Sequence, residues 1–596
     1  MVNEEMIWDL AQLVEFDDPA YISERLTALV RWAEGYRDQH RGKIEDYDAH
    51  QVFDMIAQYD REFLEFDGPN QYASLRYQAD VTDEVGQKLF EKARQSAMLM
   101  NQALAFFVLE LGKLLSKNPE IIEAAELSEY RHQLEKIQRM YPHLLPEEQE
   151  QLIIVKDQNG IRAWEKLFSE WLATRTFEIE IKGEKKVMPY GEIIGLYESP
   201  DRDLRKRANQ VVYETLSKDA TLWASAILAV FKDHHQMTKL RKWDTPMTQS
   251  LIANDVDEET IEALITTIEK NVGVLQRYLR LKAKIMGLEK LGNWDITAPL
   301  PNSPDKKYNW AESRSLVVEA YKDFDEQSGE WIDEMYQRRH MDAEVRKGKT
   351  SGAFCATWHA GQSAYILQSF NGIMGDVYTS AHELGHALHA YLGTRAQTLS
   401  NYEIGSCIAE TGSIFGELLL TEKMLADAKT KEEKQAILSI ILDGFGEAGF
   451  QVSARVFFET SIYDALAEGK FLDAEKISDL WVAARNMIYG DAVEWLPIMR
   501  YWWTMKMHFY MPNYRYYNYP YVYAQLFVFA MYRLYKQQGK EFAPKLKALL
   551  AAGSSRSPRE LAANIGFDIT KEEFWQKGID QYAEFIKMFE ATMSNV

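Results

Sequence analysis

The chain has 596 residues and a mass of 69.1 kDa, with 68 lysines and arginines against 90 aspartates and glutamates, so its formal net charge is −22. This acidic balance argues against a nucleic-acid-binding protein, which needs a surplus of cations. Hydrophobic residues make up 46% of the chain and aromatic residues 12%, which is too rich for a disordered protein. We therefore expect a folded protein with no nucleic-acid partner.

Helices should dominate the chain. Only 16 of its residues are proline and 32 are glycine, and residues 19–39 and 257–287 place apolar side chains at three- and four-residue steps. No Pro-, Gly- or Ser-rich linker and no fixed-period repeat divides the sequence. We expect a mainly α fold of one or two tightly joined lobes.

The sequence predicts no membrane span and no disulfide framework. The longest apolar runs, which start after Gln102 and Tyr523, are about half the roughly 20 residues that a membrane helix needs. The chain has two cysteines, Cys355 and Cys407, and its first residues lack the basic-then-apolar order of a secretory signal. We expect a cytoplasmic protein that has no membrane partner.

Two short segments have the pattern of strands. Residues 177–188 alternate around Gly183 like a hairpin, and Ser363 to Asn371 form a second extended segment. The hairpin is the best candidate for a boundary between lobes. We therefore predict an N-terminal helical region over residues 1–190 and a second region, which contains the site described next, over residues 191–596.

Residues 376–392 predict a helix with two histidines on one side. Asp376 is a candidate N-cap and Gly393 a candidate stop signal, and the apolar residues share one face. His382 and His386 are one turn apart on the opposite side, where two imidazoles can bind one Zn²⁺. Glu383 lies about 100° round the helix, beside the metal. This is a His-Glu-x-x-His motif.

A catalytic zinc site needs a third protein ligand and an open position for water. His389 lies about 10.5 Å along the helix axis from His382, too far for both to reach one ion, so we interpret it as a supporting residue. The helix expected next supplies Glu403, Glu410 and Glu417 at seven-residue steps on one face. Spacing alone does not choose among these three carboxylates.

At these residues the sequence resembles the oligoendopeptidase F and thimet oligopeptidase family of zinc peptidases. The stretch YILQSFNGIMGDVYTSAHELGHALH is similar to that family's strand-loop-helix block, and ETGSIFGE is similar to its Glu-x-x-Ser-x-x-x-Glu segment. By this resemblance Glu410 is the third metal ligand. Weaker similarity starts at Glu198 and at His508, so the resemblance covers roughly residues 175 to 590.

The resemblance implies a mainly α, two-lobed helical metallopeptidase with a deep substrate channel and a small β element near the active site. It implies one zinc ion per chain, and oligopeptides as substrates. It also implies that the extended segment Ser363 to Asn371 is a strand along which a substrate could add by backbone pairing.

The residues of this site support peptide hydrolysis. Zn²⁺ held by His382, His386 and Glu410 would lower the pKa of a bound water and polarise the scissile carbonyl. Glu383 would take the proton of the water and pass it to the leaving amine. We therefore predict that Glu383 acts as the general base.

A tyrosine-rich segment is the natural source of donors for the oxyanion of the tetrahedral intermediate. Tyr510 to Tyr523 holds seven tyrosines in fourteen residues, and His508 comes just before it. In the family that the sequence resembles, a histidine followed by several tyrosines faces the metal. We predict that His508, Tyr514 and Tyr521 act at the site.

The leading hypothesis is a zinc-dependent oligoendopeptidase that cuts internal bonds of short unfolded peptides. One alternative is an exopeptidase on the same scaffold, which would remove dipeptides or single residues from one end. Another is an inactive peptide-binding protein that holds zinc structurally, although structural zinc sites usually have four protein ligands. The sequence predicts neither the cleavage preference nor the oligomeric state.

Overall fold

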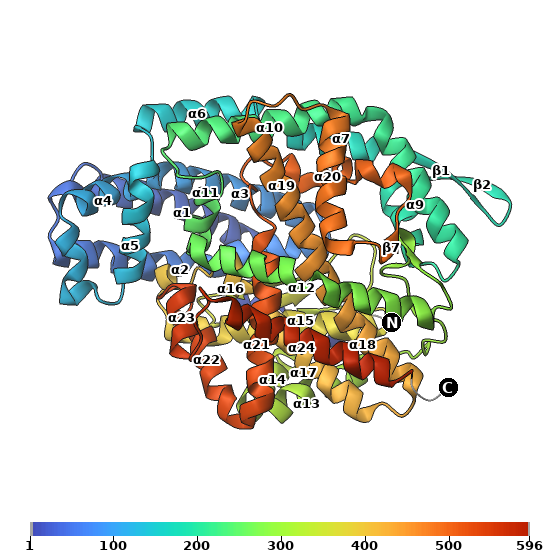
Figure 1. The fold of residues 1–596 in the computed structure, drawn as a ribbon. Helices are drawn as coiled ribbons and strands as arrows, with labels where there is room; N and C mark the ends of the chain where they lie inside the picture. The colour runs from blue at the N-terminus through green and yellow to red at the C-terminus, as the bar shows by residue number, and fades with distance from the viewer. Residues whose placement is uncertain (1–3, 594–596) are drawn as a thin grey trace. The chain divides into compact units, whose positions relative to one another are not determined.

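Helices make up almost all the secondary structure of the computed structural model, which describes residues 4–593 (Figure 1). The predicted mainly α fold is confirmed. The described chain divides into two compact units of three segments each. Unit 1 contains the residues up to Pro142, Asp305–Asp427 and Met531–Asp568, and unit 2 contains the segments between and after them. The sequence predicts one boundary along the chain, between residues 1–190 and 191–596, whereas each unit combines three separate segments. The predicted division is therefore not tested by these units and stays a prediction.

Unit 1 packs helices around one small sheet. Its helices are α1 (Pro19–His40), α2 (Ala49–Ala79), α3 (Glu84–Leu104), α4 (Phe106–Lys117), α5 (Arg131–Met140), α13 (Trp310–Phe324), α14 (Glu326–Gln337), α15 (Met374–Ala396), α16 (Ser406–Ala409), α17 (Thr411–Asp427), α22 (Ala543–Ala551) and α23 (Pro558–Asn564). Its strands are β4 (Met341–Asp342), β5 (Phe354–Trp358) and β6 (Ser363–Leu367). They pair in the order β4-β6-β5, with β4 parallel and β5 antiparallel to β6.

The N-terminal helices of unit 1 begin at residues that suit helix starts. The Asp18 carboxylate accepts the backbone N–H of Tyr21 at 3.0 Å, and Pro19 occupies the first position of α1. Asp48 and Gln51 form a reciprocal capping box at the start of α2. These helices pack against the sheet through a buried cluster that includes Trp8, Leu26, Leu75, Trp358, Tyr365 and Leu367.

One helical stretch, Glu84–Lys117, is long and apolar enough to cross a membrane by length and composition, a test that core helices also pass. Its residues Phe106, Leu111, Leu114 and Leu115 are buried in a core cluster of unit 1. Of the apolar window that passes the test, 28% is buried in the structure. The predicted cytoplasmic location stays a prediction, and the first three residues, on which it partly rests, lie outside the described ones.

Unit 2 contains the remaining helices and the predicted hairpin. Its helices are α6 (Glu147–Asn159), α7 (Ala163–Thr174), α8 (Tyr190–Gly195), α9 (Arg202–Leu216), α10 (Ala220–Leu240), α11 (Thr248–Asn254), α12 (Glu258–Ile285), α18 (Lys431–Phe445), α19 (Val452–Ala467), α20 (Ala474–Tyr489) and α24 (Glu572–Ala591). Strands β1 (Thr176–Ile181) and β2 (Glu184–Pro189) confirm the hairpin, and β3 (Leu291–Gly292) pairs with β7 (Val493–Glu494). Helix α21 (Tyr519–Gln538) contributes residues to both units.

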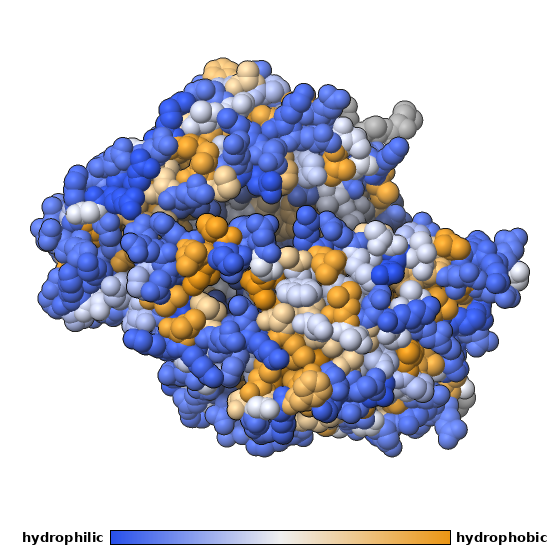
Figure 2. Space-filling view, turned by 90° about the horizontal axis from the view of Figure 1, so that it is seen from above, coloured by the Kyte–Doolittle hydropathy of each residue, from blue (hydrophilic) through white to orange (hydrophobic). Residues whose placement is uncertain are grey.

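The surface agrees with the acidic, polar composition. Figure 2 shows one face of the molecule, on which hydrophilic residues predominate and hydrophobic residues gather in small patches. Scattered exposed apolar side chains are normal for a folded protein.

Candidate active site

Helix α15 presents the two histidines of the predicted motif. It begins at Met374, two residues before Asp376, so Asp376 is inside the first turn and its carboxylate accepts the N–H of Ile373 at 3.2 Å. Asp376 is therefore not the N-cap. The helix also continues past Gly393 to Ala396. At Gly393 a Cβ would lie 2.9 Å from the nearest ring atom of Tyr402, so glycine serves this contact and does not end the helix. The predicted helix is confirmed, but both of its predicted ends are wrong.

Three of the predicted ligands come together on α15 and at the start of α17. The Nε2 atoms of His382 and His386 lie 3.4 and 3.3 Å from the same oxygen, Oε2 of Glu410. One ligand atom from each side chain falls within 4.8 Å of the others, in a group that could hold a metal ion. Two imidazole nitrogens and one carboxylate oxygen are ligands that Zn²⁺ accepts, and three protein ligands leave a position open.

Glu410 occupies a break between two helices. Its backbone (φ −82°, ψ 5°) ends the short α16, and α17 starts at the next residue. Glu403 precedes α16, so the prediction that Glu403, Glu410 and Glu417 share one face of a continuous helix is wrong. The break turns the Glu410 carboxylate towards the histidines, and the Ser413 hydroxyl donates to its Oε2 at 2.7 Å.

A pair of glycines lets α15 and α17 approach closely enough for this geometry. A Cβ on Gly385 would lie 2.3 Å from the carbonyl oxygen of Gly412, and a Cβ on Gly412 would lie 2.4 Å from that of Gly385. Either contact is far below a normal van der Waals distance. Gly385 directly precedes His386, and Gly412 follows Glu410 by two residues, so the contact sits beside the ligands.

Electrostatic interactions in this group favour the charged form of the Glu410 carboxylate, and a hydrogen bond orients the imidazole of His382. The Nδ1 atom of His382 lies 2.6 Å from Oε1 of Glu417, so its Nε2 faces the other ligands. Burial alone would lower the pKa of His382, but the hydrogen bond and charge of Glu417 outweigh it and raise the pKa to about 9. Burial opposes ionisation of Glu410 too, yet His386, His382 and Ser413 lower its pKa to about 2.

Glu383 and His389 are buried beside the ligands. Glu383 is 6% exposed, and burial raises its pKa although the neighbouring histidines oppose the change. A carboxylate with a raised pKa is suited to accept a proton near neutral pH. His389 is 3% exposed, and burial lowers its pKa to about 3, so it is neutral. It is not among the three clustered ligands, in agreement with its interpretation as a supporting residue.

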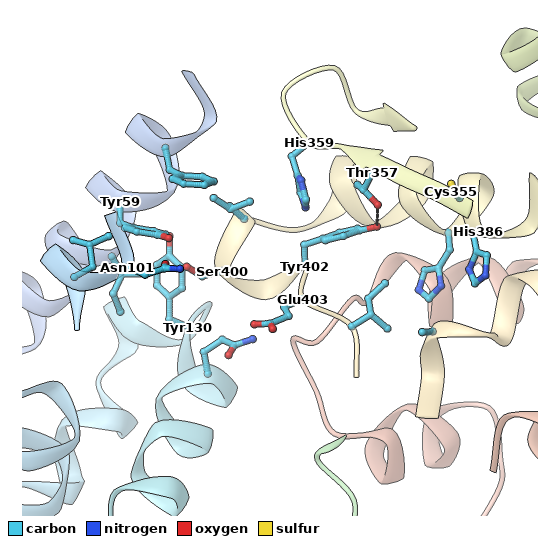
Figure 3. Close-up of a pocket in the computed structure, with 18 of the residues that line it drawn as sticks. Tyr59, Asn101, Tyr130, Cys355, Thr357, His359, His386, Ser400, Tyr402 and Glu403 are labelled. Carbon is cyan, nitrogen blue, oxygen red and sulfur yellow. Dashed lines mark hydrogen bonds between the residues drawn. The ribbon is translucent and has the colours of Figure 1, made fainter. Parts of the chain in front are cut away.

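The ligands and Glu383 line a cavity of about 1020 Å³ that lies entirely within unit 1. Figure 3 shows His386 and Cys355 at one end of it, Tyr59 and Tyr130 at the other, and Tyr402 between them. The hydroxyl groups of Tyr402 and Thr357 are 2.9 Å apart. The wall far from the histidines is largely apolar and includes Ile56, Phe63, Leu104, Phe107, Val108 and Leu134.

The sheet presents strand β5, not β6, at its edge. The segment Ser363 to Asn371 does contain a strand, β6, but β6 is the central strand and pairs on both sides. A substrate therefore cannot add along it, and that expectation is wrong. The free edge belongs to β5, whose residues Phe354, Cys355 and Thr357 line the cavity.

Residues Cys355 and Thr357 direct their backbone groups away from β6. The Thr357 carbonyl accepts the side-chain N–H of Gln71 at 2.9 Å, so it points to the outer edge. Cys355, two residues earlier, has the same orientation because backbone groups alternate along a strand. Cys355 lies opposite Ile366 in the β5–β6 pair. The backbone N–H of Ile366 donates to the carbonyl oxygen of His340, on the β4 side, at 2.9 Å. Ile366 therefore makes no backbone hydrogen bond to Cys355, which agrees with the outward orientation of Cys355.

The comparisons with known proteins identify the family. The profile of peptidase family M3 matches residues 196–581, and that of oligopeptidase F matches residues 119–177. The chain belongs to peptidase family M3. It is therefore a metallopeptidase that hydrolyses peptide bonds, and the resemblance stated from the sequence is confirmed.

Relatives in this family align with most of the chain. It is 28% identical over 511 residues to the group B oligopeptidase PepB of Streptococcus agalactiae, covering 84% of each chain. It is 25% identical over 565 residues to the oligopeptidase PepF of Bacillus subtilis, covering 94% of this chain and 83% of the relative. The structure of oligoendopeptidase F from Enterococcus faecium has the same fold, with a TM-score of 0.70 at 22% identity over 96% of this chain and 99% of the other.

The predicted oxyanion donors form a cluster of their own in unit 2. His508 lies on a short 3₁₀ helix, Met507–Phe509, and its ring stacks on Tyr517 with centroids 5.3 Å apart. Tyr514 packs against Tyr517 at 4.5 Å, and the hydroxyl of Tyr521 donates to that of Tyr517 at 3.3 Å. Burial and nearby cations lower the pKa of His508 to about 4. The structure brings these residues together, and their role in catalysis stays a prediction.

The sequence reasoning missed β5 and the aromatic wall of the cavity. The runs FCATW and SAYIL, separated by the turn residues HAGQ, have the pattern of a hairpin, so β5 could have been found. Tyr59 and Tyr130 lie some 250 to 350 residues from the motif in the chain. No local pattern connects them with it.

Proposed function

We propose that this protein is a zinc-dependent oligoendopeptidase that hydrolyses internal bonds of short unfolded peptides. The observation that carries the proposal is the position of His382, His386 and Glu410 in the wall of a large cavity, next to the buried carboxylate of Glu383. The relatives named oligopeptidase and oligoendopeptidase F support the choice of peptides as substrates.

Zinc suits the donor set of this site. The two imidazoles offer Nε2 atoms, Glu410 offers Oε2, and no cysteine belongs to the group. Glu417 holds His382 by its Nδ1 atom, as carboxylates commonly do for metal-bound histidines. When bound, the ion would act as a Lewis acid towards the scissile carbonyl and lower the pKa of water.

Glu383 then has the role of proton carrier. Its carboxylate accepts a proton from the attacking water and donates it to the amine nitrogen as the peptide C–N bond breaks. Glu383 follows His382 directly in the chain and lines the same cavity, which supports this role. Burial of the carboxylate keeps bulk water from competing for the proton and raises its pKa towards the working range.

The substrate pairs with the edge of β5. The outward backbone N–H and C=O of Cys355 can exchange two hydrogen bonds with an extended peptide, which fixes its register without reading its side chains. The peptide then runs past the histidines towards the apolar wall of the cavity. This arrangement favours extended, unfolded chains over folded proteins. The deep channel that the resemblance implies stays a prediction.

The test is hydrolysis of an internally quenched peptide of about ten residues, blocked at both ends, with the products identified by mass spectrometry. We expect internal cuts that disappear with a zinc chelator and in Glu383→Gln. The matched control is Glu91→Gln, which makes the same chemical change at an exposed carboxylate of unit 1 paired with Arg94. It should cut like the wild type.

The outcomes separate the alternatives. Cleavage only of peptides with a free end would support an exopeptidase. No cleavage of any peptide by the zinc-loaded protein would support a binding protein. Full activity in Glu383→Gln would show that another group takes the proton.

A further inference from the structure

A second cavity, of about 250 Å³, lies entirely within unit 2. At about 30 Å³ for each water molecule in the liquid, it has room for a molecule about the size of one amino acid. One wall is a face of α20, formed by Trp481, Arg485 and Tyr489 at four-residue steps. The opposite walls include Trp495, Trp502 and the π-helix Gly446–Gln451. Such π-helical turns are frequent at functional sites.

Arg485 is a buried cation that lacks an anionic partner. It is 6% exposed, and its guanidinium stacks over the ring of Trp495 at 4.2 Å. Its Nε and Nη2 atoms donate to the amide oxygen of Asn486 at 3.2 and 3.1 Å. Among the described residues no carboxylate forms an ion pair with it. A buried charge in this condition is costly unless a counter-charge binds, and burial accordingly lowers its pKa to about 10.

Three further polar atoms around the cavity have no hydrogen-bond partner among the described residues. They are the indole nitrogens of Trp481 and Trp495 and the hydroxyl oxygen of Tyr197. Trp481 is 3% exposed. Each of these three atoms has less than 1 Å² of accessible surface, so none of them is open to the cavity. The group that a ligand of this cavity could meet is therefore the charge of Arg485.

The acidic groups of the cavity do not compete for Arg485. Asp443 is neutralised by Lys282, whose Nζ lies 2.7 Å from it, and also accepts the Tyr278 hydroxyl at 2.7 Å. Glu447 is exposed on the π-helix and, among the described residues, forms no ion pair with Arg485. Arg485 is therefore the cation of this cavity without an ionic partner, and the rest of the lining combines aromatic and aliphatic side chains with polar ones such as Asn209 and Gln451.

We propose that this cavity binds the carboxylate of a small molecule with an apolar body, through the guanidinium of Arg485. Planar guanidinium groups bind carboxylates in a bidentate manner, and the aromatic walls bury the apolar body. A free amino acid or the C-terminal residue of a short peptide has this chemistry. The site is separate from the metal ligands, all of which belong to unit 1.

The test uses 4-methylpentanoate and its isosteric neutral amide as probes, with binding followed by tryptophan fluorescence and by calorimetry. We expect the carboxylate to bind and the amide to bind at least tenfold more weakly, because a charged hydrogen-bonded pair is lost. Leucine and N-acetyl-leucine, compared with leucinamide, show whether a free amino acid or a blocked peptide end is preferred. Both carboxylates should bind better than leucinamide.

Two variants test Arg485. Arg485→Gln should weaken carboxylate binding at least tenfold, and Arg485→Lys, which keeps the charge but loses the planar fork of donors, should weaken it by a smaller factor. Arg280→Gln is the control, since Arg280 is an exposed arginine of the same unit that pairs with Asp491 outside the cavity. Equal binding of acid and amide, no binding of either, or unchanged binding in a folded Arg485→Gln would overturn the proposal. If Arg485→Gln fails to fold, the test rests on Arg485→Lys, and unchanged binding in that variant would overturn the proposal.

Discussion

Substitution of Gly412 by alanine tests whether close packing of α15 and α17 builds the metal centre. The added Cβ would lie 2.4 Å from the carbonyl oxygen of Gly385, whereas ordinary contacts of this kind are about 3.4 Å or longer. The backbone fixes the position of a Cβ and the oxygen is itself a backbone atom, so no rotamer change relieves the clash. The helices must separate by about 1 Å, and overpacking of this kind costs about 1–3 kcal/mol of unfolding free energy.

The separation should also damage the site. Gly412 follows Glu410 by two residues and Gly385 precedes His386, so a shift of about 1 Å reaches both sides of the ligand group. Metal sites tolerate deviations of only about 0.2 Å in ligand distances. We therefore expect Gly412→Ala to lower the melting temperature by several degrees and to weaken zinc binding at least tenfold.

Thermal unfolding and zinc competition with a chromophoric chelator measure the two effects. Gly35→Ala is the matched control, because Gly35 lies inside α1 and a Cβ there meets nothing within 4 Å. That variant should be as stable as the wild type or more stable by about 0.5–1 kcal/mol. If Gly412→Ala keeps wild-type stability and zinc affinity, the glycine contact does not set the position of Glu410, and the reasoning fails.

Further predictions concern a metal-supporting carboxylate, a buried histidine and the cavity wall. Glu417→Gln should weaken zinc binding by about 10–100-fold, since Glu417 holds His382 by its Nδ1 atom at 2.6 Å; equal affinity in chelator competition would show that packing alone orients His382. Burial lowers the pKa of His340 to about 3, so the unfolded chain binds a proton below about pH 6.5 that the folded protein does not. Stability should therefore fall by about 2 kcal/mol from this residue between pH 7.5 and pH 5. His340→Gln should flatten that part of the profile in denaturant unfolding, and an unchanged slope would contradict the assignment. Tyr402→Phe removes the hydroxyl that lies 2.9 Å from that of Thr357 and should raise KM for the quenched peptide more than it lowers kcat; the opposite split would place Tyr402 in the chemical step.

The two clustered histidines could be predicted because their geometry is local. His382 and His386 depend on one helix only, and its period places them together whatever the rest of the chain does. The choice of Glu410 could not be made from spacing, because the decisive feature is a break between α16 and α17 that no strong helix-breaking residue marks. The choice of Glu410 as the third ligand rests on the family resemblance, and the clustering of Glu410 with His382 and His386 agrees with it.

Gly393 shows why the end of α15 was predicted wrongly. Glycine after a helical run is a common stop signal, but it is also needed where another side chain comes close to a helix. Here the ring of Tyr402 occupies the space that a Cβ would fill. Sequence alone does not distinguish the two uses, because the second depends on a contact with a residue that follows the helix in the chain and folds back on it.

The order of strands in the small sheet decides where a substrate can bind, and it depends on contacts that lie far apart in the chain. The residues of β6 alone predict a strand. Its central position, however, depends on pairing with β4 on one side and β5 on the other. With β6 enclosed, the only edge of this sheet that lines the cavity is β5.

A β-branched or bulky residue would change side-chain contacts at Cys355 but would leave its backbone N–H and C=O in place. Proline there would remove the N–H, so Cys355→Pro should abolish cleavage while Cys355→Val retains it, if backbone pairing at this edge holds the peptide. Loss of activity in both variants, with both folded, would instead assign the effect to the side chain beside Glu383.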